Sequence, residues 1–303
     1  MRRDPPRPKP TIRSEPRSDP RPDRVSDAKA KPTAGDGRPA SVPAANSKPD
    51  RDGAAKLVRV AGLPAVAALF ATAPDRVERL YFEPGIGARA SAFCKTLAAA
   101  RKPYNQVTPD ELARIAGTPM HGSIVAFAIP KAVLALKLPE AIAWSRTRAL
   151  LLVLDGVGNP HNLGAIARTA AFFGLPRMVV SDAPGQALPS DAAYRVARGG
   201  LEHVPIYQAA NLPRLLKALR PHYLVLGAAL ATGKAPEDIL KSPRPLALVI
   251  GNEEDGLPPS TLEACEAIVT IPGAGADHMQ SLNVAASSAI LIHALLGRRK
   301  AQA

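Results

Sequence analysis

The chain has 303 residues, a formal charge of +13 and a pI near 10.1. This length allows about two domains, and so basic a balance favours a polyanionic partner, nucleic acid or an anionic membrane surface, although a merely soluble basic protein would share it. The sequence has two cysteines, Cys94 and Cys265, whose wide separation argues against a disulfide scaffold or a zinc site. It shows neither a run of about 20 apolar residues nor the apolar core of a secretory signal, so we expect a cytoplasmic protein.

Residues 1–53 differ in composition from the rest of the chain. The first 50 residues hold 11 Pro, no Phe, Trp or Tyr, and 12 Lys or Arg against 7 Asp or Glu, a net charge of +5. Such a segment cannot bury enough apolar surface to offset the entropy lost on ordering, so we expect a disordered basic tail. The tail either attaches loosely to RNA by charge, with a steep salt dependence, or is a passive solubilising segment.

Residues 56–130 predict a small α/β unit. Its expected elements are a strand and a helix within 57–71, a strand at 77–84, a helix at 89–102, a strand and a helix within 104–117, and a strand at 123–130. For the helix within 104–117, Thr108 is the predicted N-cap, Pro109 takes the first helical position, and Glu111 completes a capping box.

After a connection at 131–148 with one short helix candidate at 139–144, strands and helices alternate to the end of the chain. Strands are expected at 149–154, 177–181, 202–207, 223–227, 246–250 and 267–271, and helices at 162–173, 190–198, 211–219, 258–266 and 281–296. This alternation predicts parallel strands joined by helical crossovers. The strands are almost continuously apolar, which is typical of a sheet covered on both faces.

Three segments place polar residues at the end of an apolar run. They read LLLVLDGVGNPHNLGAIARTA (150–170), LALVIGNEEDGL (246–257) and IPGAGADHMQSLNVAASSAIL (271–291). In open parallel sheets, ligands bind at the carboxyl ends of strands. The three ends therefore predict one composite site that contains Asn162, Arg168, Glu253, Ser281 and Asn283.

Each of these residues also has a simpler structural interpretation. Asn162 and Ser281 are natural helix N-caps, Arg168 is a solvated helix charge, and Glu253 belongs to a solvated acidic turn. If the second segment is functional, Gly251 lets a ligand approach the backbone closely.

Known nucleotide and metal motifs do not describe these segments. In the first one, His161 occupies the last glycine position of a dinucleotide fingerprint, and no GK[ST] follows to make a phosphate-binding loop. No metal-ligand spacing is found among the histidines His121, His161, His203, His222 and His293.

Together, the three segments resemble the motifs of the SpoU (TrmH) family of RNA ribose 2′-O-methyltransferases, part of the SPOUT superfamily. The matching stretches are NPHNLGAIARTA, IGNEEDGL and the IP-G and SLNVAASSAIL parts of the third segment, in the family's order and spacing, over about 149–296. The stretch at about 58–129, ending in HGSIVAFA (121–128), resembles more weakly the RNA-substrate-binding domain that often precedes the catalytic domain in this family.

The resemblance implies an α/β fold in three parts. These are a disordered tail (1–53), a small α/β/α RNA-binding domain (56–130), and a parallel-sheet catalytic domain (148–303) with a SPOUT-like trefoil knot. General topology rules argue against a knot, so this expectation rests on the family alone. The family is usually homodimeric, with its active site near the dimer interface.

The resemblance also implies a cofactor, S-adenosylmethionine, bound in the knot, and no metal. Gly251, Ile271 and Leu282 would hold the cofactor, largely through backbone groups. Asn162, Arg168, Glu253, Ser281 and Asn283 would line the catalytic site. The loop GAGADHMQ at 273–280 is longer than is common in the family, which puts the cofactor geometry in question.

The matching arginine is the family's proposed proton acceptor, but a guanidinium stays protonated in proteins. We therefore expect Arg168 to hold a phosphate or the incipient alkoxide. Asn162 and Ser281 would orient the ribose or Arg168, and Glu253 would position Arg168 or Asn283.

The expected function is S-adenosylmethionine-dependent methylation of a ribose 2′-OH in tRNA or rRNA. The alternative is a non-catalytic RNA-binding protein of the same fold that acts in ribosome assembly. A nucleotide-dependent enzyme of another kind is disfavoured because both nucleotide fingerprints are missing.

Overall fold

The computed structural model of the chain describes residues 57–229, 233–239, 242–273 and 281–297. The tail predicted at 1–53 and most of the loop at 273–280 lie outside the described residues. None of the helices in this described part is both long and apolar enough to cross a membrane.

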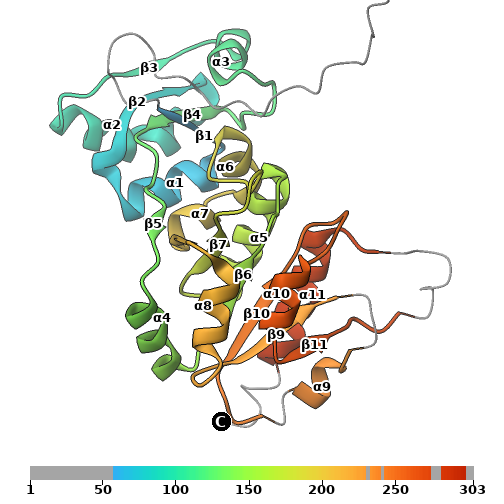
Figure 1. Cartoon of the computed structure of the whole chain (residues 1–303). Coiled ribbons are helices and arrows are strands. Elements are labelled where there is room, and N and C mark those ends of the chain that lie inside the picture. Colours follow the sequence, from blue (N-terminus) through green and yellow to red (C-terminus); the bar gives the residue numbers. More distant parts are fainter. Residues whose placement is uncertain (1–56, 230–232, 240–241, 274–280, 298–303) are drawn as a thin grey trace, which may run out of the picture. The chain divides into compact units, whose positions relative to one another are not determined.

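A small four-stranded sheet is formed by the first part of the described chain (Figure 1). Its strand order is β1 (Val58–Ala61), β4 (Ile124–Ala128), β2 (Val77–Phe82) and β3 (Tyr104–Gln106). Strand β4 runs antiparallel to both of its neighbours, and β3 runs parallel to β2. The expected small α/β unit is thus present.

Helices cover both faces of the small sheet. Helices α1 (Leu63–Thr72) and α2 (Gly87–Ala99) bury Leu69 and Leu97 with Leu80 of the sheet, whereas α3 (Pro109–Ala116) packs Leu112 against Val125 on the opposite face. The predicted cap of α3 is confirmed: Thr108 Oγ1 accepts a hydrogen bond from the Glu111 amide at 3.3 Å.

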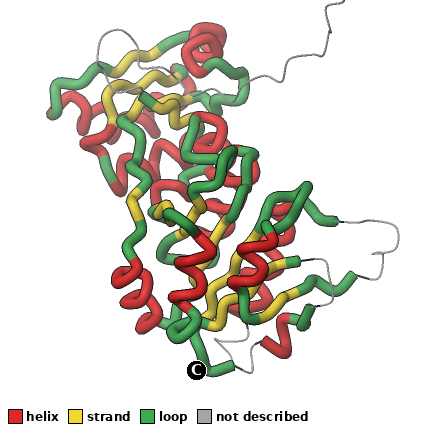
Figure 2. The backbone as a smooth tube through the Cα atoms, viewed as in Figure 1, coloured by secondary structure: helices red, strands yellow, loops and turns green. Residues whose placement is uncertain are grey.

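The large sheet has seven strands, and all of its pairs are parallel, as predicted. Figure 2 shows its strands side by side, with helices around them. The order is β11 (Ala267–Val269), β9 (Leu224–Ala228), β10 (Leu246–Ile250), β6 (Leu151–Leu154), β7 (Met178–Ser181), β8 (Ile206–Ala209) and β5 (Leu134–Ala135). Strand β5, which the sequence analysis missed, belongs to the connection between the two sheets and has only two residues.

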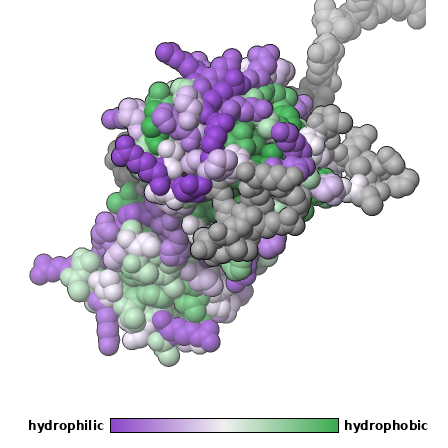
Figure 3. Space-filling model, turned by 90° about the horizontal axis from the view of Figure 1, so that it is seen from below, coloured by the Kyte–Doolittle hydropathy of each residue, from purple (hydrophilic) through white to green (hydrophobic). Residues whose placement is uncertain are grey.

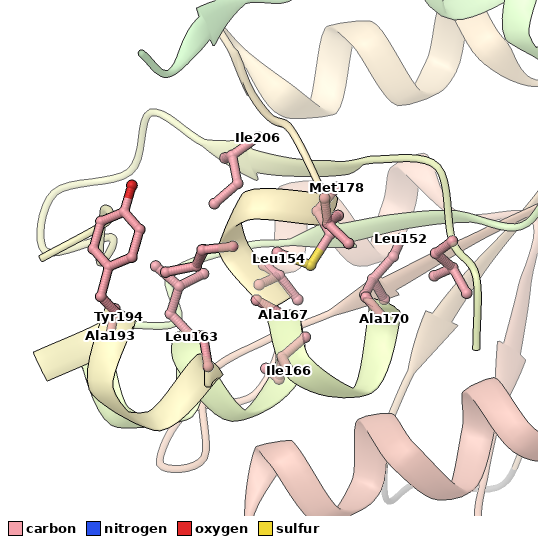
Figure 4. Close-up of a cluster of buried hydrophobic side chains, with 14 of the residues drawn as sticks. Leu152, Leu154, Leu163, Ile166, Ala167, Ala170, Met178, Ala193, Tyr194 and Ile206 are labelled. Carbon is pink, nitrogen blue, oxygen red and sulfur yellow. The ribbon is translucent and has the colours of Figure 1, made fainter. Parts of the chain in front are cut away.

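Alternate residues of each large-sheet strand serve different layers. Leu152 and Leu154 of β6 pack with α5 (Pro160–Phe172), α6 (Asp191–Ala197), α7 (Gly200–His203) and α11 (Val284–Gly297). Figure 4 shows part of this layer, including Leu163 and Ile166 of α5. Leu151 and Val153 face α4 (Leu138–Trp144), α8 (Leu212–Leu219) and α10 (Pro259–Ala264). The sheet is therefore covered on both faces, as its apolar strands predict.

The prediction of a strand at 202–207 was wrong in its first half. Residues Gly200–His203 form the short helix α7, and strand β8 begins only at Ile206. Gly199 supplies a left-handed turn (φ 100°) that starts α7, and Pro205 separates it from the strand. The single turn α9 (Pro236–Ile239) was not predicted from the sequence.

One face of the molecule carries both hydrophilic and apolar residues. On the face drawn in Figure 3, strongly hydrophilic residues lie between smaller apolar areas. The expected trefoil knot depends partly on residues 274–280, which lie outside the described part of the chain, and it stays a prediction.

Candidate functional site

Side chains from all three polar segments meet at the carboxyl ends of the large-sheet strands. Asn162 Nδ2 donates to Glu253 Oε1 at 2.9 Å, and Asn283 Nδ2 donates to Asn162 Oδ1 at 3.1 Å. The strands before the first two segments, β6 and β10, are direct neighbours in the sheet. Glu253 and Asn283, which lie 91 and 121 positions after Asn162 in the sequence, are thus both bonded to its side-chain amide. The predicted convergence is observed for these three side chains.

Asn162 is not the N-cap of its helix. Helix α5 begins at Pro160, and Asn159 caps it by accepting a hydrogen bond from the His161 amide at 2.8 Å. Pro160 at the first helical position explains the earlier start, because its fixed φ suits a helix and it has no N–H to satisfy. Asn162 consequently lies inside the first turn, only 7 % exposed, with its side chain free to bridge the other two segments.

The expected cap of the last helix was also wrong. Helix α11 begins at Val284, and Asn283, not Ser281, precedes it directly. Asn283 Oδ1 accepts a hydrogen bond from the Ala285 amide at 2.9 Å, which is the interaction of an N-cap. The exposed Ser281 lies outside the helix, and its hydroxyl makes no hydrogen bond with any residue in the described part of the chain. Asn283 therefore caps α11 with its oxygen and holds Asn162 with its nitrogen.

The loop after β10 is shaped by a residue that the sequence analysis did not single out. Asn252 Oδ1 accepts hydrogen bonds from the amides of Glu254 (2.9 Å) and Asp255 (2.6 Å), which makes an Asx turn. This turn leaves Glu254 and Asp255 exposed and directs Glu253 inward. An Asn followed by three acids and a Gly is a turn pattern, and it was the available signal.

Gly251 is needed by the loop itself. A Cβ built on Gly251 would lie 2.1 Å from the Gly256 carbonyl oxygen and 2.5 Å from the Leu257 nitrogen. The loop folds back through an Asn252–Gly256 bridge, with the Asn252 amide donating to Gly256 O at 3.1 Å. We expected a ligand to approach the backbone at Gly251. The atoms that lie next to the Gly251 α-carbon are instead backbone atoms of the same loop.

A second buried contact ties the first segment to the helix that follows the second. Thr261 Oγ1 of α10 donates to Asp155 Oδ2 at 2.6 Å, and both residues are buried. Asp155 follows β6 directly, and its amide donates to Ile250 O at 2.9 Å. This pair, which the sequence analysis missed, fixes the base of the site.

Arg168 is not brought together with the other site residues. It lies six residues beyond Asn162 on α5, about 9 Å along the axis and on another side of the helix. Its side chain is exposed, and its guanidinium has no hydrogen-bonding or ionic partner among the described residues. Ile271 is half-buried against the core, whereas Leu282 is 46 % exposed.

The side chains that meet at the site are polar. No group of three or more His, Cys, Asp or Glu that could hold a metal occurs among the residues that the structure places. Glu253 Oε2 is buried and lacks a hydrogen-bond partner within the same residues. A buried carboxylate oxygen in this state favours a cationic neighbour.

Comparison with known families gives this arrangement an identity. Residues 149–293 match the SpoU rRNA Methylase family, and residues 59–133 match the domain described as RNA 2′-O ribose methyltransferase substrate binding. A 23S rRNA (guanosine-2′-O-)-methyltransferase, RlmB, of Acinetobacter baylyi is 32 % identical over 238 residues, which cover 77 % of this chain and 94 % of that protein. The chain belongs to the SpoU family.

Other SpoU-family relatives are similar over most of the chain. RlmB of Nitrosomonas europaea is 36 % identical over 60 % of this chain and 69 % of that protein. YfiF of Escherichia coli O157:H7, named an uncharacterized tRNA/rRNA methyltransferase, is 33 % identical over 78 % of this chain and 67 % of that protein.

Solved structures share the SpoU fold. AviRb of Streptomyces viridochromogenes, in complex with AdoMet, has a TM-score of 0.64 at 21 % identity and covers 82 % of this chain and 92 % of that one. An AdoMet-bound rRNA methyltransferase of Sinorhizobium meliloti has a TM-score of 0.64 at 22 % identity, over 81 % and 88 %. The expected α/β fold with its parallel sheet is confirmed.

Proposed function

We propose that this SpoU-family chain is an S-adenosylmethionine-dependent RNA methyltransferase that acts on a ribose 2′-OH. The observation that carries the proposal is the hydrogen-bonded trio of Asn162, Glu253 and Asn283, which joins all three family motifs at the carboxyl ends of the strands.

The residues present fit the proposed cofactor. When bound, S-adenosylmethionine supplies an electrophilic methyl group on a positively charged sulfonium centre. Gly251, Ile271 and Leu282 would hold it, largely through backbone groups, and the exposed Leu282 offers apolar surface. The unpartnered Glu253 Oε2 suits a cationic ligand.

The chain's own residues would align and activate the hydroxyl. Arg168 carries a permanent positive charge, so it would stabilise the alkoxide that forms as the 2′-OH passes its proton to solvent, or bind an adjacent phosphate. Ser281, whose hydroxyl has no partner in the described chain, would contact the ribose. Proximity and orientation of this kind lower barriers by up to about 7–11 kcal/mol.

The hydrogen bond to Asn162 supports a role for Glu253 that differs from the one expected. Its carboxylate holds Asn162 directly and makes no contact with Arg168 or Asn283 among the described residues. We assign Asn162 to the fixed centre of the site, with Glu253 and Asn283 orienting its amide from either side.

Ribosomal RNA is the favoured substrate class, with tRNA as the alternative. Several similar relatives are named 23S rRNA (guanosine-2′-O-)-methyltransferases. We assign residues 56–130 to RNA binding, residues 148–303 to catalysis and residues 1–53 to a basic tail, and we place the activity in the cytoplasm.

The small sheet offers a specific RNA-facing row. Arg59, Phe127 and Arg79 stand opposite one another on three adjacent strands, and both guanidinium carbons lie within 5.5–5.9 Å of the Phe127 ring centroid. Arginine planes and aromatic rings are the surfaces on which unpaired RNA bases stack.

A homodimer is the proposed assembly, formed through α5 and α11. Phe172 is 84 % exposed and lies one turn beyond Arg168 on α5, and Ile290 on the adjoining α11 is 42 % exposed. A second copy on this surface would bring Arg168 to the interface. Sedimentation of the full chain measures the assembly directly.

The test of the function is transfer of tritiated methyl from S-adenosylmethionine to separated tRNA and rRNA pools taken from cells that lack this gene. We expect label in the rRNA pool. The same transfer is measured on assembling ribosomal particles. A protein that binds the cofactor but labels neither pool and no assembling particle would favour the non-catalytic RNA-binding alternative.

A further inference from the structure

A buried ionic cluster joins the small sheet to helix α7 of the large one. Arg76, in the turn Pro74–Arg76 that leads into β2, places Nη1 2.6 Å from Glu202 Oε2 of α7. Arg76 Nε also donates to Ile129 O at 2.9 Å. Lys131 Nζ donates to two carbonyls of α7, Glu202 O at 2.6 Å and Leu201 O at 3.2 Å. Both the carboxylate and the last carbonyls of α7 are thus held from outside the helix.

This cluster is removed from water. The Glu202 side chain is 1 % exposed and that of Arg76 is 14 % exposed. Burial lowers the pKa of Lys131 and raises the pKa of Tyr194, whose hydroxyl lies 3.4 Å from Arg76 Nη2. Charges buried in this way need their partners far more than exposed ones do.

A second ion pair joins the same two sheets but is exposed. Arg59 of β1 and Asp191 of α6 lie 3.6 Å apart, with side chains 43 % and 44 % exposed. Exposed pairs contribute little to stability. This pair is therefore a built-in comparison for the Arg76–Glu202 pair.

Helix α7 touches the helix that carries Arg168. A Cβ built on Gly200, the first residue of α7, would lie 2.7 Å from Arg168 Cα and 2.8 Å from both Arg168 N and Ala167 O. The two backbones are therefore in direct contact, and a shift of α7 must move this part of α5. Packed elements of this kind move as units.

We propose that Arg76 and Glu202 are positioning residues, which hold α7 and, through Gly200, the segment of α5 that carries Arg168 in register with the small sheet. The inference rests on the proposed function, in which the small sheet holds RNA and Arg168 acts on its ribose. An RNA bound to the small sheet then meets Arg168 in a fixed place because one buried ion pair links the two.

The main test uses the double variant R76M/E202Q. Removing one partner alone leaves a buried charge without compensation, and the protein could fail to fold; the double variant removes both charges and keeps similar volumes. D191N is the matched control, since its amide oxygen still accepts the Arg59 amide. Three quantities are measured on folded protein: the dissociation constant of S-adenosylmethionine, that of the RNA substrate, and the single-turnover methylation rate.

We expect the double variant to keep both dissociation constants within twofold and to lose at least tenfold in rate, while D191N keeps the cofactor dissociation constant and the rate within twofold. A change in the RNA dissociation constant of D191N reports on Arg59, which belongs to the RNA-facing row. G200A adds a methyl group that pushes on the Arg168 backbone, so it should also keep both dissociation constants within twofold and lower the rate. A wild-type rate in the folded double variant, or an RNA affinity that falls in step with the rate, would overturn the proposal.

Hydrogen exchange gives a readout that does not depend on activity. In R76M/E202Q, the α5 amides around Arg168 should exchange at least tenfold faster than in D191N. Unchanged exchange of these amides would contradict the link through α7, whether or not the wild-type protein methylates RNA. A wild-type protein that methylates no RNA would count against the proposed function and not against this link.

Discussion

At the scale of single residues, the site is organised around one side-chain amide. Asn162 uses its nitrogen for Glu253 and its oxygen for Asn283, so its orientation is set by two segments far away in the sequence. An amide suits this position because it donates and accepts at once, whereas a carboxylate can only accept.

Asn162→Asp should therefore disable the site. The new carboxylate would face Glu253 across a buried contact, leaving two like charges and no donor, which costs at least about 1–3 kcal/mol. We expect a lower melting temperature and a loss of methyl transfer of at least a hundredfold, measured by thermal unfolding and by turnover. The neighbouring His161→Ala is the control, because His161 is exposed; equal losses in both variants would refute the special role of Asn162.

The sequence indicates three of the residues that meet, but neither how they meet nor that Arg168 and Ser281 stay apart from them. Asn162, Glu253 and Asn283 could be selected because each follows an apolar strand or opens a helix. The cap of α11 could not be chosen, since Ser281 and Asn283 are both good N-caps. Arg168 could be selected by family resemblance, yet its separation from Asn162 follows only from the helix geometry.

At the scale of elements, the loop after β10 is as much a part of the site as its side chains. The Gly251 α-carbon lies so close to Gly256 O that no side chain fits there. The loop that directs Glu253 inward therefore requires glycine at this position.

Gly251→Ala should open this loop. The added methyl group would push Gly256 away and cost about 1–3 kcal/mol, as overpacking does. We expect cofactor affinity, measured by calorimetry, to fall at least tenfold. Gly273→Ala is the matched control in the third segment, because none of the described residues lies within 4 Å of its added Cβ; a tight-binding Gly251→Ala protein would remove the loop from cofactor binding.

The linking helix α4 is fastened by a tyrosine whose ionisation should be visible in stability. Tyr223 is buried, and its hydroxyl donates to Ala141 O at 3.1 Å. Burial raises the pKa of Tyr223 to about 12. Above pH 10, tyrosine in the unfolded chain ionises first, so the unfolded state is favoured, and the folded state loses about 2 kcal/mol between pH 10 and 12.

Tyr223→Phe should be less stable at pH 8, by about 1–3 kcal/mol, because Ala141 O loses its donor. Its stability should then fall less steeply than that of the wild type between pH 10 and 12. Urea unfolding of both proteins across this range measures the difference, and parallel curves would contradict the assignment.

Elements were predicted well where an apolar run has clear ends, and poorly where one or two residues determine whether a short segment is a helix or a strand. Strand β10 was predicted with its observed bounds, because five apolar residues lie between a proline and a glycine. Glu202 was placed in a strand because VPIY follows it. Only the structure shows that Gly199 and Arg76 hold Glu202 in a short helix instead.

At the scale of the whole molecule, the charge is spread over every part of the chain. The first 50 residues supply +5 of the total +13. Cations that neutralise phosphates release counterions, so their contribution to RNA affinity falls as salt rises.

Deleting residues 1–53 should weaken RNA binding more at low salt than at high salt and flatten the plot of log affinity against log salt. Filter binding at salt concentrations from about 50 to about 300 mM measures this change in slope. A full-length chain with glutamine for the tail's Lys and Arg residues separates charge from length. Equal affinities for the truncated and intact chains at every salt concentration would make the tail a bystander.

The most direct test of the account is the chemical position of the methyl group that the protein adds to RNA. The labelled RNA is hydrolysed with alkali, which cannot cleave next to a 2′-O-methylated ribose, and the wild type is compared with Arg168→Ala. We predict label in alkali-resistant dinucleotides for the wild type, and a loss of label in the variant with cofactor binding retained. Label in alkali-sensitive mononucleotides, or full turnover without the arginine, would contradict the account.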